Sequence, residues 1–199
     1  MTKARGRPRK FDPETALTAA GQLFWQRGYD ATSLDQLAQA MDMNRPSIYN
    51  AFGGKRDIYV AAIDHFCALL RGGVEALMAE PDLGTALERF YDQAISIYCA
   101  TDPQLGCMVM CTLPAPAVVE SEFGERLRSV IADIDTAFEQ RLRMAAESTD
   151  IADDIDIKGA ARLLQATLHT IALRARAGET PRRLKQISRF TISLLLKSS

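Results

Sequence analysis

The sequence has very few of the residues from which catalytic and metal sites are usually built. It contains only two histidines in 199 residues, His65 and His169, and neither has the spacing of a metal ligand. It has no glycine-rich phosphate loop and no nucleophile-elbow pattern, and its four cysteines follow no zinc-binding spacing. These absences argue against an enzyme. We expect no catalytic residue, no metal and no cofactor.

Long apolar runs are also missing. No stretch of about 18 apolar residues occurs, and the basic N-terminus leads into a polar helix instead of the apolar core of a signal peptide. Nearly half of the residues are hydrophobic and a quarter are charged, which is typical of a globular protein. We therefore expect a cytoplasmic protein with no membrane contact, whose cysteines are reduced thiols.

The formal net charge of -1 conceals an uneven distribution of charge. Residues 1–56 contain nine basic and five acidic groups, whereas the remainder contains 15 basic and 20 acidic groups. Because binding to nucleic acids depends on local charge, the basic N-terminal part and the acidic remainder are expected to meet different partners.

Two helices are predicted at the beginning of the chain. Asp12 can cap a helix whose first turn tolerates Pro13, and Gly28 is typical of the position after a helix end. A second helix follows, and either Thr32 or Ser33 can cap it.

Two further helices are predicted after a short break. Asn44 is a suitable cap for the third helix, which should end at Gly53. A fourth begins near Lys55, and Gly72 and Gly73 predict its kink or its end. Together the second and third helices form a candidate helix-turn-helix at about residues 33–53.

The third helix has two different faces. Ile48 and Phe52 should face inward together, whereas Arg45, Ser47 and Asn50 point outward. Outward donors and acceptors on such a helix can contact base edges or phosphates in the major groove. A helical corner with solvated polar residues is the alternative, which spacing alone leaves open.

A more specific pattern lies within the same region. It comprises Gly28, Thr32, Leu37, Ala38 and the segment MDMNRPSIYNAFGGKRDIY at residues 41–59, including Ser47, Ile48, Tyr49, Phe52 and Lys55. This pattern resembles the TetR family of bacterial repressors over roughly the first quarter of the chain. The resemblance implies an all-α fold with an N-terminal three-helix helix-turn-helix DNA-binding domain and a C-terminal helical regulatory and dimerisation domain. The domains predicted are a flexible basic arm at 1–10, a DNA-binding domain at 11–56, and a ligand-binding and dimerisation domain at 57–199.

The resemblance also implies roles for individual residues. Tyr49 and Lys55 would touch phosphates, and Thr32 or Ser33 would cap a helix against the DNA backbone. Ala51 departs from the family pattern, because many relatives carry histidine there, so the resemblance implies no contact with the DNA backbone at this position. The DNA-binding residues implied outside the arm are Thr32, Ser33, Asn44, Arg45, Ser47, Tyr49, Asn50 and Lys55.

The basic arm has two interpretations. Arg5, Gly6, Arg7 and Pro8 reproduce the core of hooks that place arginines in a narrow minor groove. A solvated tail that contributes only nonspecific counterion release is an equal alternative.

Helical periodicity continues through the C-terminal part, without a convincing strand pattern. The penultimate helix is apolar almost all round, which suggests a subunit interface or, equally, burial within one subunit. The resemblance implies that the last two helices of each subunit form a homodimer. The helical segments are predicted at 84–100, 122–147, 157–177 and 181–197.

Family resemblance implies that the C-terminal domain holds an internal pocket for a small-molecule inducer. Cys107 and Cys111 are four residues apart, and a thiol at a helix N-terminus can have its thiolate favoured, so Cys107 could sense an electrophile or oxidant. The candidates for ligand binding or sensing are Tyr91, Tyr98, Cys107, Met108, Cys111, Phe138 and His169. For each of these residues, an ordinary role in the hydrophobic core is the alternative.

The sequence thus predicts a ligand-responsive repressor that binds a palindromic operator in double-stranded DNA as a homodimer. Activation in place of repression stays open, as does an adaptor that dimerises without operator affinity.

Overall fold

The computed structural model describes residues 12–148, 151 and 154–196, and the predicted basic arm lies outside them. The chain divides into two compact units, one ending at His65 and the other beginning at Phe66. Within the described residues there is no β-strand, only one isolated antiparallel bridge between Ile151 and Leu196. The fold is all-α, as predicted. None of the described helices is long and apolar enough to cross a membrane.

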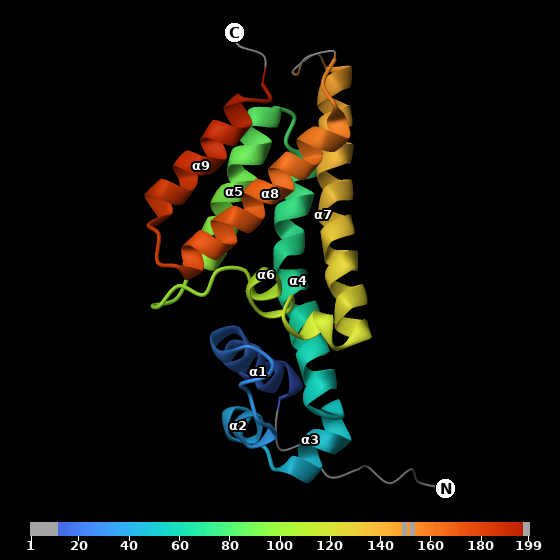
Figure 1. Cartoon of the computed structure of the whole chain (residues 1–199), viewed down its shortest axis with the longest axis vertical. Coiled ribbons are helices and arrows are strands. Elements are labelled where there is room, and N and C mark those ends of the chain that lie inside the picture. Colours follow the sequence, from blue (N-terminus) through green and yellow to red (C-terminus); the bar gives the residue numbers. More distant parts are fainter. Residues whose placement is uncertain (1–11, 149–150, 152–153, 197–199) are drawn as a thin grey trace, which may run out of the picture. The chain divides into compact units, whose positions relative to one another are not determined.

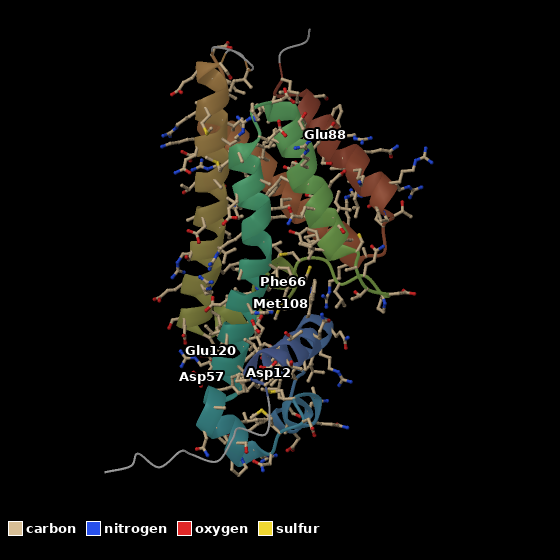
Figure 2. The ribbon with its side chains drawn as sticks, turned by 180° about the vertical axis from the view of Figure 1, so that it is seen from behind. Asp12, Asp57, Phe66, Glu88, Met108 and Glu120 are labelled. Carbon is tan, nitrogen blue, oxygen red and sulfur yellow. The ribbon has the colours of Figure 1, made fainter. Side chains whose placement is uncertain are left out.

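The N-terminal unit contains α1 (Pro13–Arg27), α2 (Leu34–Ala40), α3 (Arg45–Phe52) and the first part of α4 (Lys55–Ala79) (Figure 1). The side chains of Asp12, Ser33 and Asn44 cap the first three helices, each accepting a hydrogen bond from a backbone N–H three residues later. Asp57, labelled with Asp12 in Figure 2, accepts a hydrogen bond from the Gly54 N–H just before α4. Local capping therefore defines where these helices begin.

Ser33, not Thr32, caps α2. The Ser33 hydroxyl accepts from the Gln36 N–H at 3.2 Å, and the Gln36 side chain accepts from the Ser33 N–H at 2.8 Å. This reciprocal pair is a capping box, which satisfies two amide groups at the helix start. The Thr32 hydroxyl is buried and instead donates to the Gly28 carbonyl at 2.7 Å.

Of the two alternatives predicted at Gly72 and Gly73, a kink or an end of the fourth helix, the end is wrong, because α4 continues through both residues to Ala79. Glycine inside a helix costs only about 1 kcal/mol relative to alanine, and tertiary packing can offset this. Gly73 is buried, and a Cβ there would lie 3.1 Å from Oε1 of Gln93 on α5. The missing side chain at Gly73 therefore leaves room for the packing of α5 against α4.

The C-terminal unit contains the remaining helices. In Figure 1, α8 lies between α7 and α9, and α5 packs against α8 and α9. The four predicted helical segments agree with α5, α7, α8 and α9 to within a few residues, except that α9 ends at Ser193. The helices are α5 (Leu83–Tyr98), α6 (Met108–Thr112), η1 (Pro116–Val118), α7 (Ser121–Glu147), α8 (Ile157–Arg176) and α9 (Pro181–Ser193).

One buried cation joins two of these helices. Arg141 of α7 is only 2% exposed, and its guanidinium donates to the carbonyls of Leu77 at 3.1 Å and of Glu80 and Pro81 at 2.9 Å each. These carbonyls lie at or just beyond the C-terminal end of α4, where helix carbonyls lack partners of their own and carry partial negative charge. Arg141 therefore caps α4 from a different helix.

Candidate nucleic-acid interface and ligand pocket

The helix α3 separates its anchoring residues from its outward residues. Ile48 is completely buried, whereas Arg45 and Asn50 are exposed and Tyr49 is 57% exposed. Ser47 is half-buried. Phe52 is also only half-buried, so it anchors α3 less fully than its apolar character predicts. The exposed side chains lie close together on a short helix, at a position where they can reach a groove of DNA.

A tight turn connects α2 to α3. Asp42 has a φ of 50°, and the N–H of Met43 bonds to the Ala38 carbonyl at 2.9 Å. The left-handed conformation is accessible to aspartate at a modest cost. Met41 and Met43 on either side of Asp42 are both buried, so they hold the turn against the core of this unit.

Arg45 is held by a residue of the preceding helix. Its Nε donates to Oδ1 of Asp35 at 2.7 Å, and its Nη2 donates to Oδ2 at 2.5 Å. The hydrogen bond from Arg45 holds the pKa of the Asp35 carboxyl below its usual value. The pairing is bidentate, which is the geometry in which a guanidinium and a carboxylate orient each other best. The two helices of the helix-turn-helix are thus joined through side chains on the exposed surface.

Lys55 lies at the first position of α4, above an aromatic cluster. Its Nζ is 4.2 Å from the centre of the Tyr29 ring, and the Tyr29 ring is 5.0 Å from that of Tyr59. A cation over the face of a ring is stabilised by the ring's quadrupole. Partial burial lowers the pKa of Lys55. The aromatic cluster therefore restricts where this ammonium group can lie.

Three predicted DNA contacts are already engaged in capping or burial. The side-chain oxygen of Asn44 accepts from the Ser47 N–H at 2.9 Å, which leaves its NH2 group as the possible donor to DNA. Ser33 is exposed at the start of α2, whereas Thr32 is only 1% exposed. On this geometry, Ser33 and not Thr32 is the residue that can contact a DNA backbone. Arg5 and Arg7 lie outside the described residues.

The C-terminal unit contains a pocket of about 360 Å³, a volume within the range of small-molecule sites. Three of the predicted ligand-binding residues line it, namely Tyr98, Cys107 and His169. Most of the other lining side chains are apolar. They are Leu70, Val74, Val109, Met110, Val130, Ile131, Ile134 and Leu168.

The other four predicted ligand-binding residues are not in this lining. Tyr91 and Phe138 pack in an aromatic cluster with Phe90, and the Tyr91 hydroxyl donates to the Leu164 carbonyl at 2.7 Å. Met108 is buried, and the thiol of Cys111 lies 3.9 Å from the Ala172 carbonyl. In the structure these four residues contribute to packing instead of to the pocket.

Sequence reasoning missed the polar lining residues of the pocket. These are Arg71 and Cys67 on α4, and Arg126 and Asp133 on α7. No pattern in the sequence marked them, because each is an ordinary polar or small position on a long helix. The apolar periodicity of α7 around residues 130–134 was the one signal that could have indicated this wall of the pocket.

Three titratable groups in the pocket are shifted toward their neutral forms, and for one of them, Tyr98, burial raises the pKa well above its usual value. Burial raises the pKa of the Cys107 thiol to about 12, and hydrogen bonds from Met110 N–H and Tyr98 oppose this only partly. Burial also lowers the pKa of His169, although Asp135 opposes the shift. Cys107 occupies the N-cap position of α6, but this helix is only five residues long, and burial outweighs any effect of the helix N-terminus on the thiolate. Among the described residues, no group of histidine, cysteine and carboxylate side chains could hold a metal ion.

Comparisons with known proteins agree with this arrangement. Residues 16–62 match the family model described as bacterial regulatory proteins, tetR family. The HTH-type transcriptional repressor ComR of Escherichia coli K12 is 29% identical over 198 residues, which cover 98% of this chain and 93% of ComR. The repressor BdcR of the same organism is 32% identical over 55% of this chain and 56% of its own length.

Solved structures show a similar likeness over the full length. A cysteine mutant of the TetR family transcriptional regulator CifR, in complex with 26-bp double-strand operator DNA, has a TM-score of 0.84 and 26% identity. The match covers 96% of this chain and 100% of that one. Residues 16–62 thus match the DNA-binding part of the TetR family, and the whole chain is similar in sequence and fold to TetR family transcriptional regulators.

Proposed function

We propose that this protein is a repressor that binds a palindromic operator as a homodimer and is released from it by a small-molecule inducer. The observation that carries the proposal is the exposed face of α3, next to an anchored inner face. The likeness to ComR, a repressor, and to operator-bound CifR supports the same conclusion.

The contacts with DNA come from two groups of side chains. Arg45, Ser47 and Asn50 approach base edges, because the N-terminal part of a recognition helix enters the major groove. Tyr49 and Lys55 contact phosphates, which position the protein without reading sequence. Ser33, Asn44 and the arm residues Arg5 and Arg7 complete the proposed DNA-binding residues.

The homodimer forms through α8 and α9. These helices leave large apolar side chains exposed on one subunit, with Leu173 at 55% and Phe190 at 67%, and Leu194, directly after α9, is 60% exposed. Burying such side chains against a second copy contributes about 1.5–3 kcal/mol for each one that becomes fully buried. A twofold axis would then place two copies of α3 about 34 Å apart, the spacing of successive major grooves.

The inducer binds in the pocket formed by α4, α5, α6, α7 and α8. A ligand weakens operator binding only by its difference in affinity between the two conformations of the dimer. Because Cys107 is buried and its thiolate is disfavoured, we propose reversible noncovalent binding as the release signal. The predicted sensor role of Cys107 is tested by Cys107→Ser, since a response to an electrophile that survives this substitution would eliminate it.

The decisive experiment is enrichment of binding sites from a random duplex-DNA pool with the purified protein. We expect a palindromic motif, weakened by Tyr49→Ala and by Lys55→Ala. Arg182→Ala is the control for a general loss of positive charge, because Arg182 is an exposed cation at the start of α9. Failure to enrich any motif at moderate salt would contradict the proposal and favour an adaptor that dimerises without binding DNA.

A further inference from the structure

We propose that Arg45 recognises a guanine in each operator half-site, and that Asp35 is the positioning residue that holds the Arg45 guanidinium ready to do so. This inference rests on the proposed operator binding and names the base that is read. It concerns two residues on neighbouring helices, α2 and α3, whose side chains meet at the exposed surface of the N-terminal unit.

The contact with Asp35 uses only one side of the guanidinium. A guanidinium has five N–H groups, and the Asp35 carboxylate takes one from Nε and one from Nη2. The second N–H of Nη2 and the neighbouring N–H of Nη1 form the terminal edge, and the other N–H of Nη1 points back toward Cδ. Within the described part of the chain, Asp35 is the one hydrogen-bond acceptor that the structure gives Arg45, and the Arg45 side chain is 56% exposed. The terminal edge can therefore meet a ligand from outside the protein.

The pairing makes a phosphate an unsuitable target. Asp35 places a full negative charge 2.5 Å from the guanidinium, so the pair as a whole is neutral. Phosphate contacts depend mainly on net charge and on the release of counterions, and a neutral pair provides little of either. The carboxylate would also repel the phosphate oxygens. Hydrogen bonding to an uncharged base edge does not suffer this repulsion.

Among the bases, guanine matches the terminal edge best. Arg45 can only donate, and guanine presents two acceptors, O6 and N7, side by side in the major groove. Adenine presents one acceptor and one donor there, and cytosine presents a donor. Arg45 is the first residue of α3, which is the end of a recognition helix that reaches base edges. Orientation by Asp35 also reduces the rotamer entropy that the arginine loses on binding.

The test compares the motifs enriched from a random duplex-DNA pool by the wild type, by Arg45→Lys and by Asp35→Asn. The matched controls are Arg27→Lys on α1, which makes the same change at another exposed arginine, and Glu14→Gln, which removes an exposed acidic charge. Thermal melting by circular dichroism confirms that each variant is folded. We expect one guanine per half-site in the wild-type motif, with its preference reduced about tenfold in both variants and unchanged in both controls.

Salt dependence provides the second measurement. In Asp35→Asn the charge of Arg45 is no longer compensated, so log K against log salt concentration should become steeper by up to about 0.9. In Arg45→Ala the Asp35 carboxylate is left uncompensated near the DNA, so the slope should become shallower, and the guanine preference should be lost at the same time. A shallower slope in Arg45→Ala with an unchanged motif would instead make Arg45 a phosphate contact and overturn the inference.

The remaining outcomes are also decisive. If the wild type enriches a palindrome whose preferences survive Arg45→Lys, operator binding stands and the guanine contact is refuted. If guanine preference is lost in Arg45→Lys but retained in Asp35→Asn, the positioning role of Asp35 is refuted. If the wild type enriches no motif, both the operator binding and this inference are refuted.

Discussion

Substitution of Arg141 by methionine is expected to destabilise the C-terminal unit strongly. Methionine retains much of the apolar stem but removes all three hydrogen bonds to the end of α4. The Leu77 carbonyl is buried, and an unsatisfied buried group costs about 1–3 kcal/mol. The carbonyls of Glu80 and Pro81 are partly buried, so water can replace their partner at a smaller cost. We expect a total loss of about 3 kcal/mol in the free energy of unfolding.

For a chain of this size, that loss lowers the melting temperature by about 6–12 °C. Thermal and urea unfolding, followed by circular dichroism at one fixed protein concentration, would measure it. Arg143→Met is the matched control two residues along the same helix, because Arg143 is exposed and pairs with Glu139 at 3.0 Å on the surface. Such a surface pair contributes about 0.3–0.5 kcal/mol. Equal effects of the two substitutions would refute the capping role of Arg141.

Three further outcomes are expected. Phe190→Glu should shift the protein toward monomers in sedimentation velocity, because a charge would replace a proposed dimer contact. The control Leu69→Glu, at another exposed apolar position, should leave the dimer unchanged. Dimers that persist in Phe190→Glu would contradict the α8–α9 interface. Because the pKa of His169 is lowered in the folded state, the unfolded state binds the proton more readily, and the free energy of unfolding should fall as the pH drops below about 6.5. The fall should be smaller in His169→Gln than in the control His65→Gln. Identical pH profiles of the two variants in urea unfolding would refute this. Iodoacetamide should modify Cys107 far more slowly than the partly exposed cysteines at about pH 8. At this pH a pKa of about 12 leaves about one Cys107 side chain in ten thousand as the thiolate. Rapid labelling of Cys107, detected by mass spectrometry, would show that the pocket opens to solvent.

Much of the fold follows from local chemistry, and that part could be predicted from the sequence. Asp12, Ser33 and Asn44 begin their helices through side chains that bond three residues ahead, which is an interaction encoded within four consecutive residues. Ile48 could be assigned to the core because helical periodicity alone indicates which face is buried.

Other features depend on packing between distant segments, which no local pattern reveals. Gly73 has the chemistry of a helix end, yet α4 continues through it, and a Cβ at this position would lie 3.1 Å from Oε1 of Gln93 on α5. Arg141 is a charged residue that composition alone would place in solvent, but its side chain meets carbonyls 60 to 64 residues away in the sequence. The same reason explains why Tyr91 and Phe138 were predicted in the pocket and lie instead in the aromatic core.

The division of α3 into a buried and an exposed face has a consequence for how such a regulator changes its target. Because Ile48 carries the anchoring, Asn50 can be exchanged for another side chain with little effect on folding, so operator preference at that position can drift one substitution at a time. Arg45 is different, since its pairing with Asp35 means that a new base preference there requires compatible changes on two helices. Neighbouring positions of one short helix would therefore diversify at unequal rates, with the paired position the slower.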